Sequence, residues 1–254
     1  MSPIVMLAQP RGATVTPEAR DSFNAASLRE HKGGIAIARY SQNKGTACMN
    51  HNDCWAVMLN NRADAKLTHF AMIHGDVIAP AGWLDTLLAE MKAAGADILG
   101  AVIPLKDTRG LTSIGIENPR ERFGTKRLSM AEVFARPKTF TDPAILLNTG
   151  LWLAKVADDK GHPAEWCSKA WFSNDDDIVF RADVGPAGTW VPRFRSEDWN
   201  FFERARDAGA KCYATRVVEL VHEYPIYHTR SVWGTWAEDR DCMEAVEKAA
   251  SHAT

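Results

Sequence analysis

Several signatures of common protein classes are missing from this sequence. No GxGxxG follows the first apolar segment and no GxxxxGK occurs, so a dinucleotide-dependent dehydrogenase and a P-loop kinase are disfavoured. No apolar run is long enough to span a bilayer, and the first one is too short for a signal peptide. The five cysteines form no tight framework, which is typical of a reducing compartment. We therefore expect a soluble, cytoplasmic protein without a membrane segment.

A large excess of charge of one sign is also missing. The formal net charge is only −2, so no global electrostatic attraction to nucleic acid or to a membrane surface is expected. One segment, from Lys106 to Lys138, has more basic than acidic residues. It is either a solvated surface loop or a surface for an acidic acceptor. The basic residues concerned, besides the two ends, are Arg109, Arg120, Arg122, Lys126, Arg127 and Arg136.

The first 104 residues alternate between apolar segments of strand length and segments with helical spacing. The expected strands are Ile4–Gln9, Gly34–Tyr40, Leu67–Ile73 and Asp97–Ile103. The expected helices are Pro17–Glu30 with Thr16 as its cap, residues 46–60, and Ala81–Ala94 ending at Gly95. Three consecutive βα units predict a parallel sheet with helices on both faces. The fold class is therefore α/β.

The second half is less regular. Residues 105–142 are expected to form a long functional excursion, and residues 174–196 a polar loop. Regular elements are expected at Ala144–Ala154, a strand interrupted at residues 148–150, and then at the helix Glu197–Ala208, the strand Ala210–Val221 and a terminal helix from about Glu238. A length of 254 residues suits one domain. We divide it into a nucleotide-binding half (1–104), an acceptor half (105–236) and a C-terminal helix (237–254).

The strand at Leu67–Ile73 ends at His74-Gly75-Asp76, where an open α/β sheet carries its ligand chemistry. Asp76 can coordinate Mg²⁺ or Mn²⁺. His74 can join it on the metal, bond to a sugar hydroxyl or a phosphate, or be a structural histidine.

Glu197 and Asp198 open a helix of sequence EDWNFFERARDAG, which is followed by a strand that ends near His222. The positive end of the helix dipole is expected to keep Asp198 ionised, as a general base requires. The alternative is an ordinary helix cap with acidic residues in the first turn.

These motifs occur in an order that resembles the GT-A fold glycosyltransferases, in particular the large family that includes cellulose and chitin synthases and small bacterial and phage enzymes. The motifs are the strand-end Asp76, Asn148-Thr149-Gly150 in a buried strand, the Glu197-Asp198 helix and the late His222. The resemblance implies a mostly parallel, Rossmann-like GT-A sheet. It also implies metal-dependent, inverting transfer of a sugar from a nucleoside diphosphate sugar, with UDP-sugars as the first choice, to an acceptor hydroxyl.

The same resemblance assigns roles to individual residues. Asp76 and His222 would bind Mn²⁺ or Mg²⁺, with His74 standing where the family's short Asp-x-Asp motif has its first Asp. Asp198 would be the catalytic base, and Glu197 would orient Asp198 or the acceptor. Residues on the donor side would be Gln9, Arg11, His74, Asn148, Thr149 and Gly150.

Several alternatives stay open at this level. Arg11 is equally well a surface arginine in a turn, and Gly150 a simple bulge. The activity could instead be that of a nucleotidyltransferase, a sugar-nucleotide hydrolase or a non-catalytic sugar-nucleotide-binding protein. The acceptor could be a glycan or a modified nucleic acid. Cys48, His51 and Cys54 have helical spacing, but a structural zinc needs a fourth ligand, so we interpret them as part of a helix with buried thiols.

Overall fold

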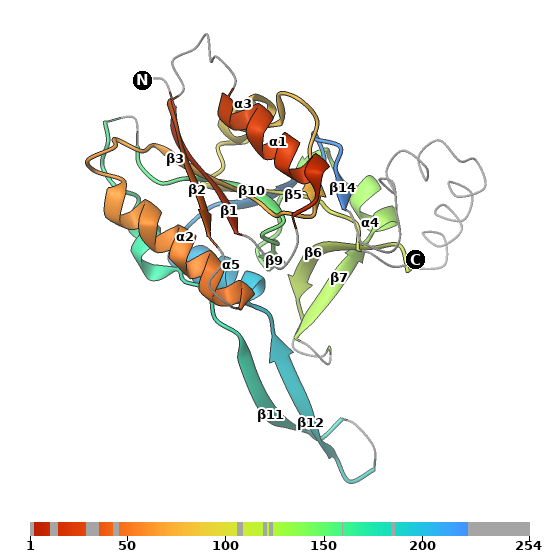
Figure 1. Cartoon of the computed structure of the whole chain (residues 1–254). Coiled ribbons are helices and arrows are strands. Elements are labelled where there is room, and N and C mark those ends of the chain that lie inside the picture. The colour runs from red at the N-terminus through yellow and green to blue at the C-terminus, as the bar shows by residue number, and fades with distance from the viewer. Residues whose placement is uncertain are drawn as a thin grey trace, which may run out of the picture.

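A seven-stranded sheet with the order β2-β1-β3-β10-β5-β13-β8 organises the chain (Figure 1). The computed structural model describes residues 3–10, 15–28, 36–42, 46–105, 109–118, 121, 124–158, 160–183 and 186–222. The strands of this sheet are β1 Ile4–Pro10, β2 Ala36–Gln42, β3 His69–Ile73, β5 Ile98–Ala101, β8 Thr139–Phe140, β10 Leu151–Lys155 and β13 Cys212–Thr215. The expected strands of the first half are thus present, with their ends shifted by a few residues.

The sheet is mostly parallel, with one antiparallel strand near its centre. β1 pairs in parallel with β2 and β3, and β5 pairs in parallel with β13, as the βα units predict. β10 lies antiparallel between β3 and β5. The expectation of a mostly parallel sheet is confirmed, and its antiparallel strands are β10 and the edge strand β8, which pairs with β13.

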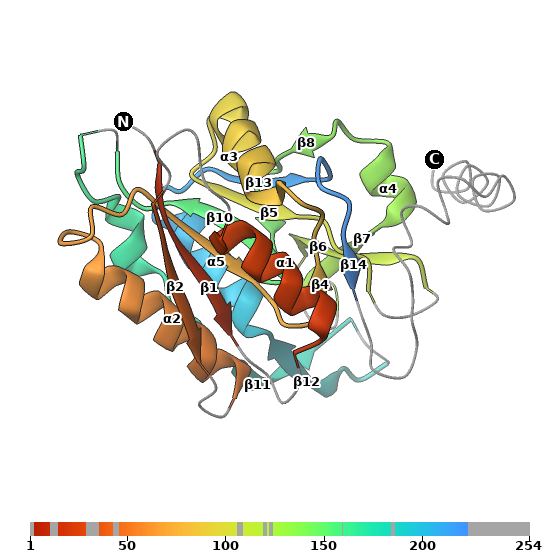
Figure 2. The same cartoon turned by 45° about the horizontal axis from the view of Figure 1, so that its top comes forward.

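Helices cover both faces of the sheet (Figures 1 and 2). One face is covered by α1, Pro17–Leu28, and α3, Trp83–Ala94; the other by α2, Ala47–Asn61, and α5, Glu197–Asp207. In β3, Phe70 and Met72 pack into the core on the α2 side, while Ala71 and Ile73 pack on the α1 side. Strands buried on both faces are apolar throughout, which explains the continuous apolar runs in the sequence.

An aromatic cluster fixes α5 against the sheet. Phe201 of α5 lies 5.1 Å from Trp55 of α2 and 5.2 Å from Trp152 of β10, measured between ring centroids. The Trp55 indole nitrogen donates to the carbonyls of Cys167 and Ala170, around the short 3-10 helix η1, Glu165–Lys169. This packing sets the position of the first turn of α5, which carries Glu197 and Asp198.

Residues 105–142 are more regular than the sequence predicts. They include β6 Leu111–Glu117, β7 Thr125–Ser129 and α4 Met130–Phe134, and a second sheet has the order β7-β6-β9 with β9 at Ile145–Leu146. The pairing of β6 with β7 shifts register between Leu111 and Gly115, and this irregularity interrupts the alternation by which a strand is recognised.

Some of the basic residues of this segment have acidic neighbours. Lys126 pairs with Glu132 at 2.6 Å and Arg136 with Asp142 at 4.0 Å. This pairing favours the interpretation as ordinary surface over an acidic-acceptor site.

The expected polar loop at residues 174–196 is instead a β-hairpin that projects from the body (Figure 1). Its strands are β11 Asp175–Arg181 and β12 Thr189–Arg195. Phe180 lies opposite Trp190 and Ile178 opposite Pro192, so these side chains share one exposed face. The three consecutive aspartates at the start of β11 resemble a loop in composition, which is why the sequence pattern misses the strand.

The last part of the described chain forms two short strands. The expected strand Ala210–Val221 ends early, because β13 stops at Thr215 and β14, Val221–His222, pairs separately with β4, Val77–Ile78. The terminal helix expected from Glu238 lies outside the described residues. Within the described part of the chain, no helix has the length and apolar character needed to cross a bilayer.

Candidate functional site

Most of the predicted site residues come together at the sheet edge where β1 and β3 end. The backbone NH of His74, directly after β3, donates to the carbonyl of Gly150 at 2.8 Å. A methyl group at Gly150 would clash with Ile103 Cδ1. Packing within the protein therefore favours a glycine here, and the two sequence interpretations, close approach of a ligand and a simple bulge, both stay predictions.

Asp76 and His222 face each other, although 145 positions separate them in the sequence. The antiparallel pairing of β14 with β4 places His222 opposite Val77, and His222 Nε2 lies 3.6 Å from Asp76 Oδ2. His222 Nδ1 lies 3.0 Å from the carbonyl oxygen of Pro104. A carbonyl only accepts hydrogen bonds, so Nδ1 carries a proton, and Nε2 is the nitrogen that faces Asp76.

This donor set fits a divalent cation. A neutral imidazole nitrogen and a carboxylate oxygen are both electron-pair donors, and a cation between them would satisfy both. The Pro104 carbonyl supplies the outer hydrogen bond that typically orients a metal-binding histidine. Asp76 and His222 are therefore the residues that could hold Mn²⁺ or Mg²⁺ at this edge.

Asp198 lies in the first turn of α5, and Thr149 holds its side chain. The hydroxyl of Thr149, which is fully buried, donates to Asp198 Oδ1 at 2.8 Å. Burial and the neighbouring charge of Glu197 raise the pKa of Asp198 to about 7, against the opposing effects of the Thr149 hydrogen bond and of Arg127. The expectation of a fully ionised Asp198 is therefore wrong. Loss of hydration outweighs the helix dipole, which favours the anion only modestly.

His51 of α2 joins this site, and the sequence pattern did not identify it. Its ring is 2% exposed and stacks on His74, with ring centroids 5.0 Å apart and an interplanar angle of 22°. One ring nitrogen, one Glu197 oxygen and one Asp198 oxygen all lie within 4.8 Å of one another. Burial and His74 lower the pKa of His51 well below its usual range, so the ring is neutral.

The neighbouring cysteines do not take part in this cluster. Cys54 is buried, and burial raises the pKa of its thiol to about 12, while the Cys48 thiol donates to the carbonyl of Phe172. The interpretation of this segment as a helix is confirmed, with Cys54 buried and Cys48 half-buried. His51 was grouped with the thiols by its spacing, and only the tertiary contacts connect it with α5.

The remaining residues predicted on the donor side have different environments. Gln9, at the end of β1, is 1% exposed. Asn148 is half-buried, and its Oδ1 has no hydrogen-bond partner among the described residues. Arg11 lies outside the described residues.

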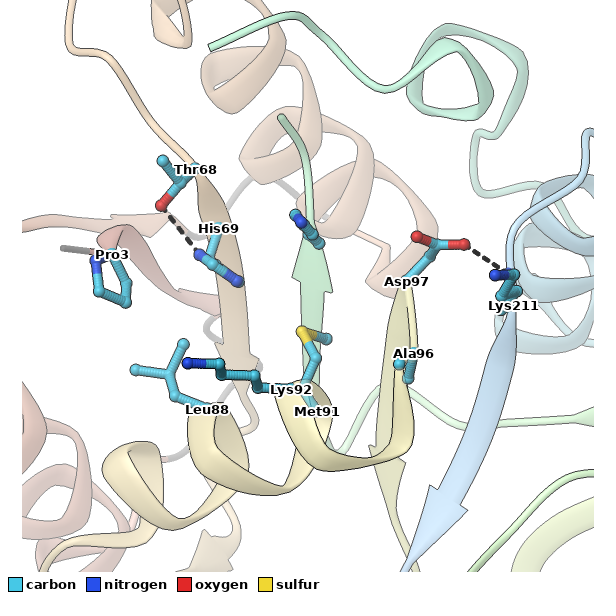
Figure 3. A pocket seen from close by; sticks show the side chains of 11 residues that line it. Pro3, Thr68, His69, Leu88, Met91, Lys92, Ala96, Asp97 and Lys211 are labelled. Carbon is cyan, nitrogen blue, oxygen red and sulfur yellow. Dashed lines mark hydrogen bonds between the residues drawn. The ribbon is translucent and has the colours of Figure 1, made fainter. Parts of the chain in front are cut away.

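A separate cavity of about 530 Å³ lies at the opposite edge of the sheet (Figure 3). It is lined by residues at the beginnings of the parallel strands, such as Thr68, Asp97 and Lys211, together with Lys92 at the end of α3. Some of its polar groups already bond to one another in this view. The backbone NH of Lys211 donates to Asp97, and the Thr68 hydroxyl bonds to the His69 ring. Ligands of open α/β sheets bind at the other edge, so this cavity is not the candidate site.

Comparison with known proteins shows a similarity between the fold of this chain and those of solved structures. No protein-family model and no curated protein matches the sequence. Among solved structures, A197 from STIV matches with a TM-score of 0.51 and 14% identity over 87% of this chain and 86% of that one. Matches with lower scores include structures described as a glycosyltransferase, a thymidylyltransferase and a UDP-N-acetylglucosamine pyrophosphorylase.

Two of these matches illustrate the range. TarS from S. aureus (1–349) has a TM-score of 0.39 and 10% identity, over 84% of this chain and 60% of that one. A structure from Bacillus anthracis, described as a glucose-1-phosphate thymidylyltransferase, has a TM-score of 0.40 and 11% identity, over 97% of this chain and 94% of that one. With its mixed sheet covered by helices on both faces, the chain has a GT-A-like α/β fold.

Proposed function

We propose that this protein is a metal-dependent glycosyltransferase that moves a sugar from a nucleoside diphosphate sugar to an acceptor hydroxyl. The observation that carries the proposal is that two chemically different groups meet at one edge of a GT-A-like sheet. The Asp76–His222 pair is suited to a cation, and Asp198 is a carboxylate with a pKa of about 7. The contacts of His74 with Gly150 and His51 connect the two groups.

Asp76 and His222 would hold Mn²⁺ or Mg²⁺, which when bound stabilises the charge of the leaving diphosphate. Asp198 would accept the proton of the acceptor hydroxyl while the oxygen of that hydroxyl attacks the anomeric carbon of the donor sugar. The bond from that carbon to the diphosphate breaks in the same step, and attack from the opposite side inverts the configuration. A base with a pKa near the working pH is efficient because it is partly ionised and still accepts a proton readily.

The other residues of the site would position these groups. Thr149 fixes the Asp198 carboxylate by its hydrogen bond. Glu197 would orient the acceptor or Asp198. Gln9, Arg11, His74, Asn148 and Gly150 would shape the donor side, with a UDP-sugar as the first donor to test. The acceptor would be a glycan or a modified nucleic acid.

The proposal is tested first by screening nucleoside diphosphate sugars for thermal stabilisation that requires Mn²⁺ or Mg²⁺, and then by assaying sugar transfer from the best donor. Asp198→Asn should lower transfer by about 10²- to 10⁴-fold, the usual contribution of a positioned base, with donor binding retained. Asp207→Asn, an exposed position at the other end of α5, is the matched control. Release of pyrophosphate from a nucleoside triphosphate would indicate a nucleotidyltransferase instead. Donor binding without any turnover would indicate a binding protein.

A further inference from the structure

We propose that His51, Glu197 and Asp198 form a second divalent-cation site, which takes Zn²⁺ or Co²⁺ in preference to Mg²⁺. An ion at this site would occupy the carboxylate that the proposed transfer reaction uses as its base. The site would therefore be inhibitory, and this regulatory part rests on the proposed function. The binding of the ion itself does not.

The geometry of the three side chains is close to that of a metal site. Their donor atoms lie within 4.8 Å of one another. Zinc bonds to histidine nitrogen and carboxylate oxygen are about 2.0–2.2 Å long, so two ligands on opposite sides of one ion lie at most about 4.4 Å apart. Small rotations of the two carboxylates at the start of α5 would be enough to close this difference.

His51 provides an independent indication of a ligand. Its side chain is 2% exposed, and its Nδ1 has no hydrogen-bond partner among the residues that the structure describes. A buried nitrogen without a partner is costly, and a cation bound at Nδ1 would offset that cost. The ring is held in place by stacking on His74 and by Phe172, whose ring centroid lies 5.1 Å away. The neutral imidazole is also the form that binds metals.

The charges around the cluster favour one added cation. Burial and the nearby charge of Glu197 both oppose the ionisation of Asp198. Arg127 offsets this effect in part from the side of β7, where its guanidinium lies 4.6 Å from the ring centroid of Trp199. Thr149 donates one hydrogen bond to Asp198. An additional ligand with positive charge would therefore stabilise the two carboxylates together.

The mixed donor set determines which ions should bind. Mg²⁺ prefers oxygen ligands and keeps much of its water, whereas imidazole suits zinc, and a site with a nitrogen ligand generally binds Co²⁺ more tightly than Mn²⁺. The site shares no ligand with the Asp76–His222 pair, although His74 stacks on His51 and precedes Asp76 by two residues. Substitutions can therefore separate the two sites.

The test uses the full chain after removal of metal with a chelator, and titration with Co²⁺ followed by visible absorption and by calorimetry. We expect two Co²⁺ ions per chain in the wild type. Asp76→Asn should remove one of them, and His51→Gln should weaken the other at least about tenfold. Glu197→Gln provides a second variant of the new site if His51→Gln fails to fold, as checked by circular dichroism. Co²⁺ binding that is lost in Asp76→Asn and unchanged in the variants of the new site would overturn the proposal.

A second measurement separates this proposal from the proposed function. Transfer assayed with Mg²⁺ should be inhibited by added Zn²⁺, and His51→Gln should need at least about tenfold more Zn²⁺ for half-inhibition. Persistent Co²⁺ binding at His51 in a protein that transfers no sugar would refute the proposed function alone. Transfer that Zn²⁺ inhibits equally in the wild type and His51→Gln would refute the inhibitory site.

Discussion

The burial of Asp198 should destabilise the folded protein at high pH. The pKa of its carboxyl rises from 3.8 to about 7 on folding. The folded protein therefore binds this proton more tightly than the unfolded chain. The resulting stabilisation is complete below pH 3.8 and is lost as the pH rises through 7. Asp198→Asn, which cannot ionise, should escape this loss.

The pKa difference sets the size of the effect. One pKa unit corresponds to about 1.36 kcal/mol, so a shift of about three units costs about 4 kcal/mol once the carboxylate is fully ionised. Part of this loss has already occurred at pH 5. Between pH 5 and pH 8, the free energy of unfolding of Asp198→Asn should therefore gain about 2–3 kcal/mol relative to the wild type.

The assay is urea unfolding of both proteins at pH 5 and pH 8, with chelator present so that no cation reaches the site. Asp207→Asn is the control, because Asp207 lies on the same helix with a side chain that is 68% exposed. Its stability difference from the wild type should be the same at both pH values. If the advantage of Asp198→Asn were equal at pH 5 and pH 8, or smaller at pH 8, the argument from burial would be refuted.

Three further predictions follow from the site. Mn²⁺ and a nucleoside diphosphate should bind more tightly together than separately, because the Asp76–His222 pair leaves coordination positions for phosphate oxygens; calorimetry should show this coupling vanish in Asp76→Ala. The hydrogen bond from Thr149 lowers the pKa of Asp198, so Thr149→Val should move the acid limb of the pH–rate profile to higher pH by up to about one unit. Thr149→Ser should restore the profile. An unmoved acid limb would count against Asp198 as the base. Gly150→Ala should cost about 1–3 kcal/mol in urea unfolding through the clash with Ile103, and an unchanged midpoint would contradict this packing.

The local pattern of the sequence was enough to predict the first three strands, their helices and the acidic first turn of α5. These elements depend on apolar periodicity and capping residues, which are properties of neighbours in the chain. The position of Asp76 directly after a buried strand belongs to the same group, because strand ends can be recognised locally. The segment from residue 175 to residue 195 was mistaken for a loop because its composition hides a two-stranded ribbon.

Only the tertiary structure decided how these parts work together. It placed β10 antiparallel between β3 and β5, and it brought His222 to Asp76 through the pairing of two very short strands. It also buried His51 beside Asp198 and raised the pKa of that carboxyl to about 7. The sequence specifies which groups are available. Their solvation and their distant neighbours, which set pKa values and ligand geometry, arise only when segments far apart in the chain pack together.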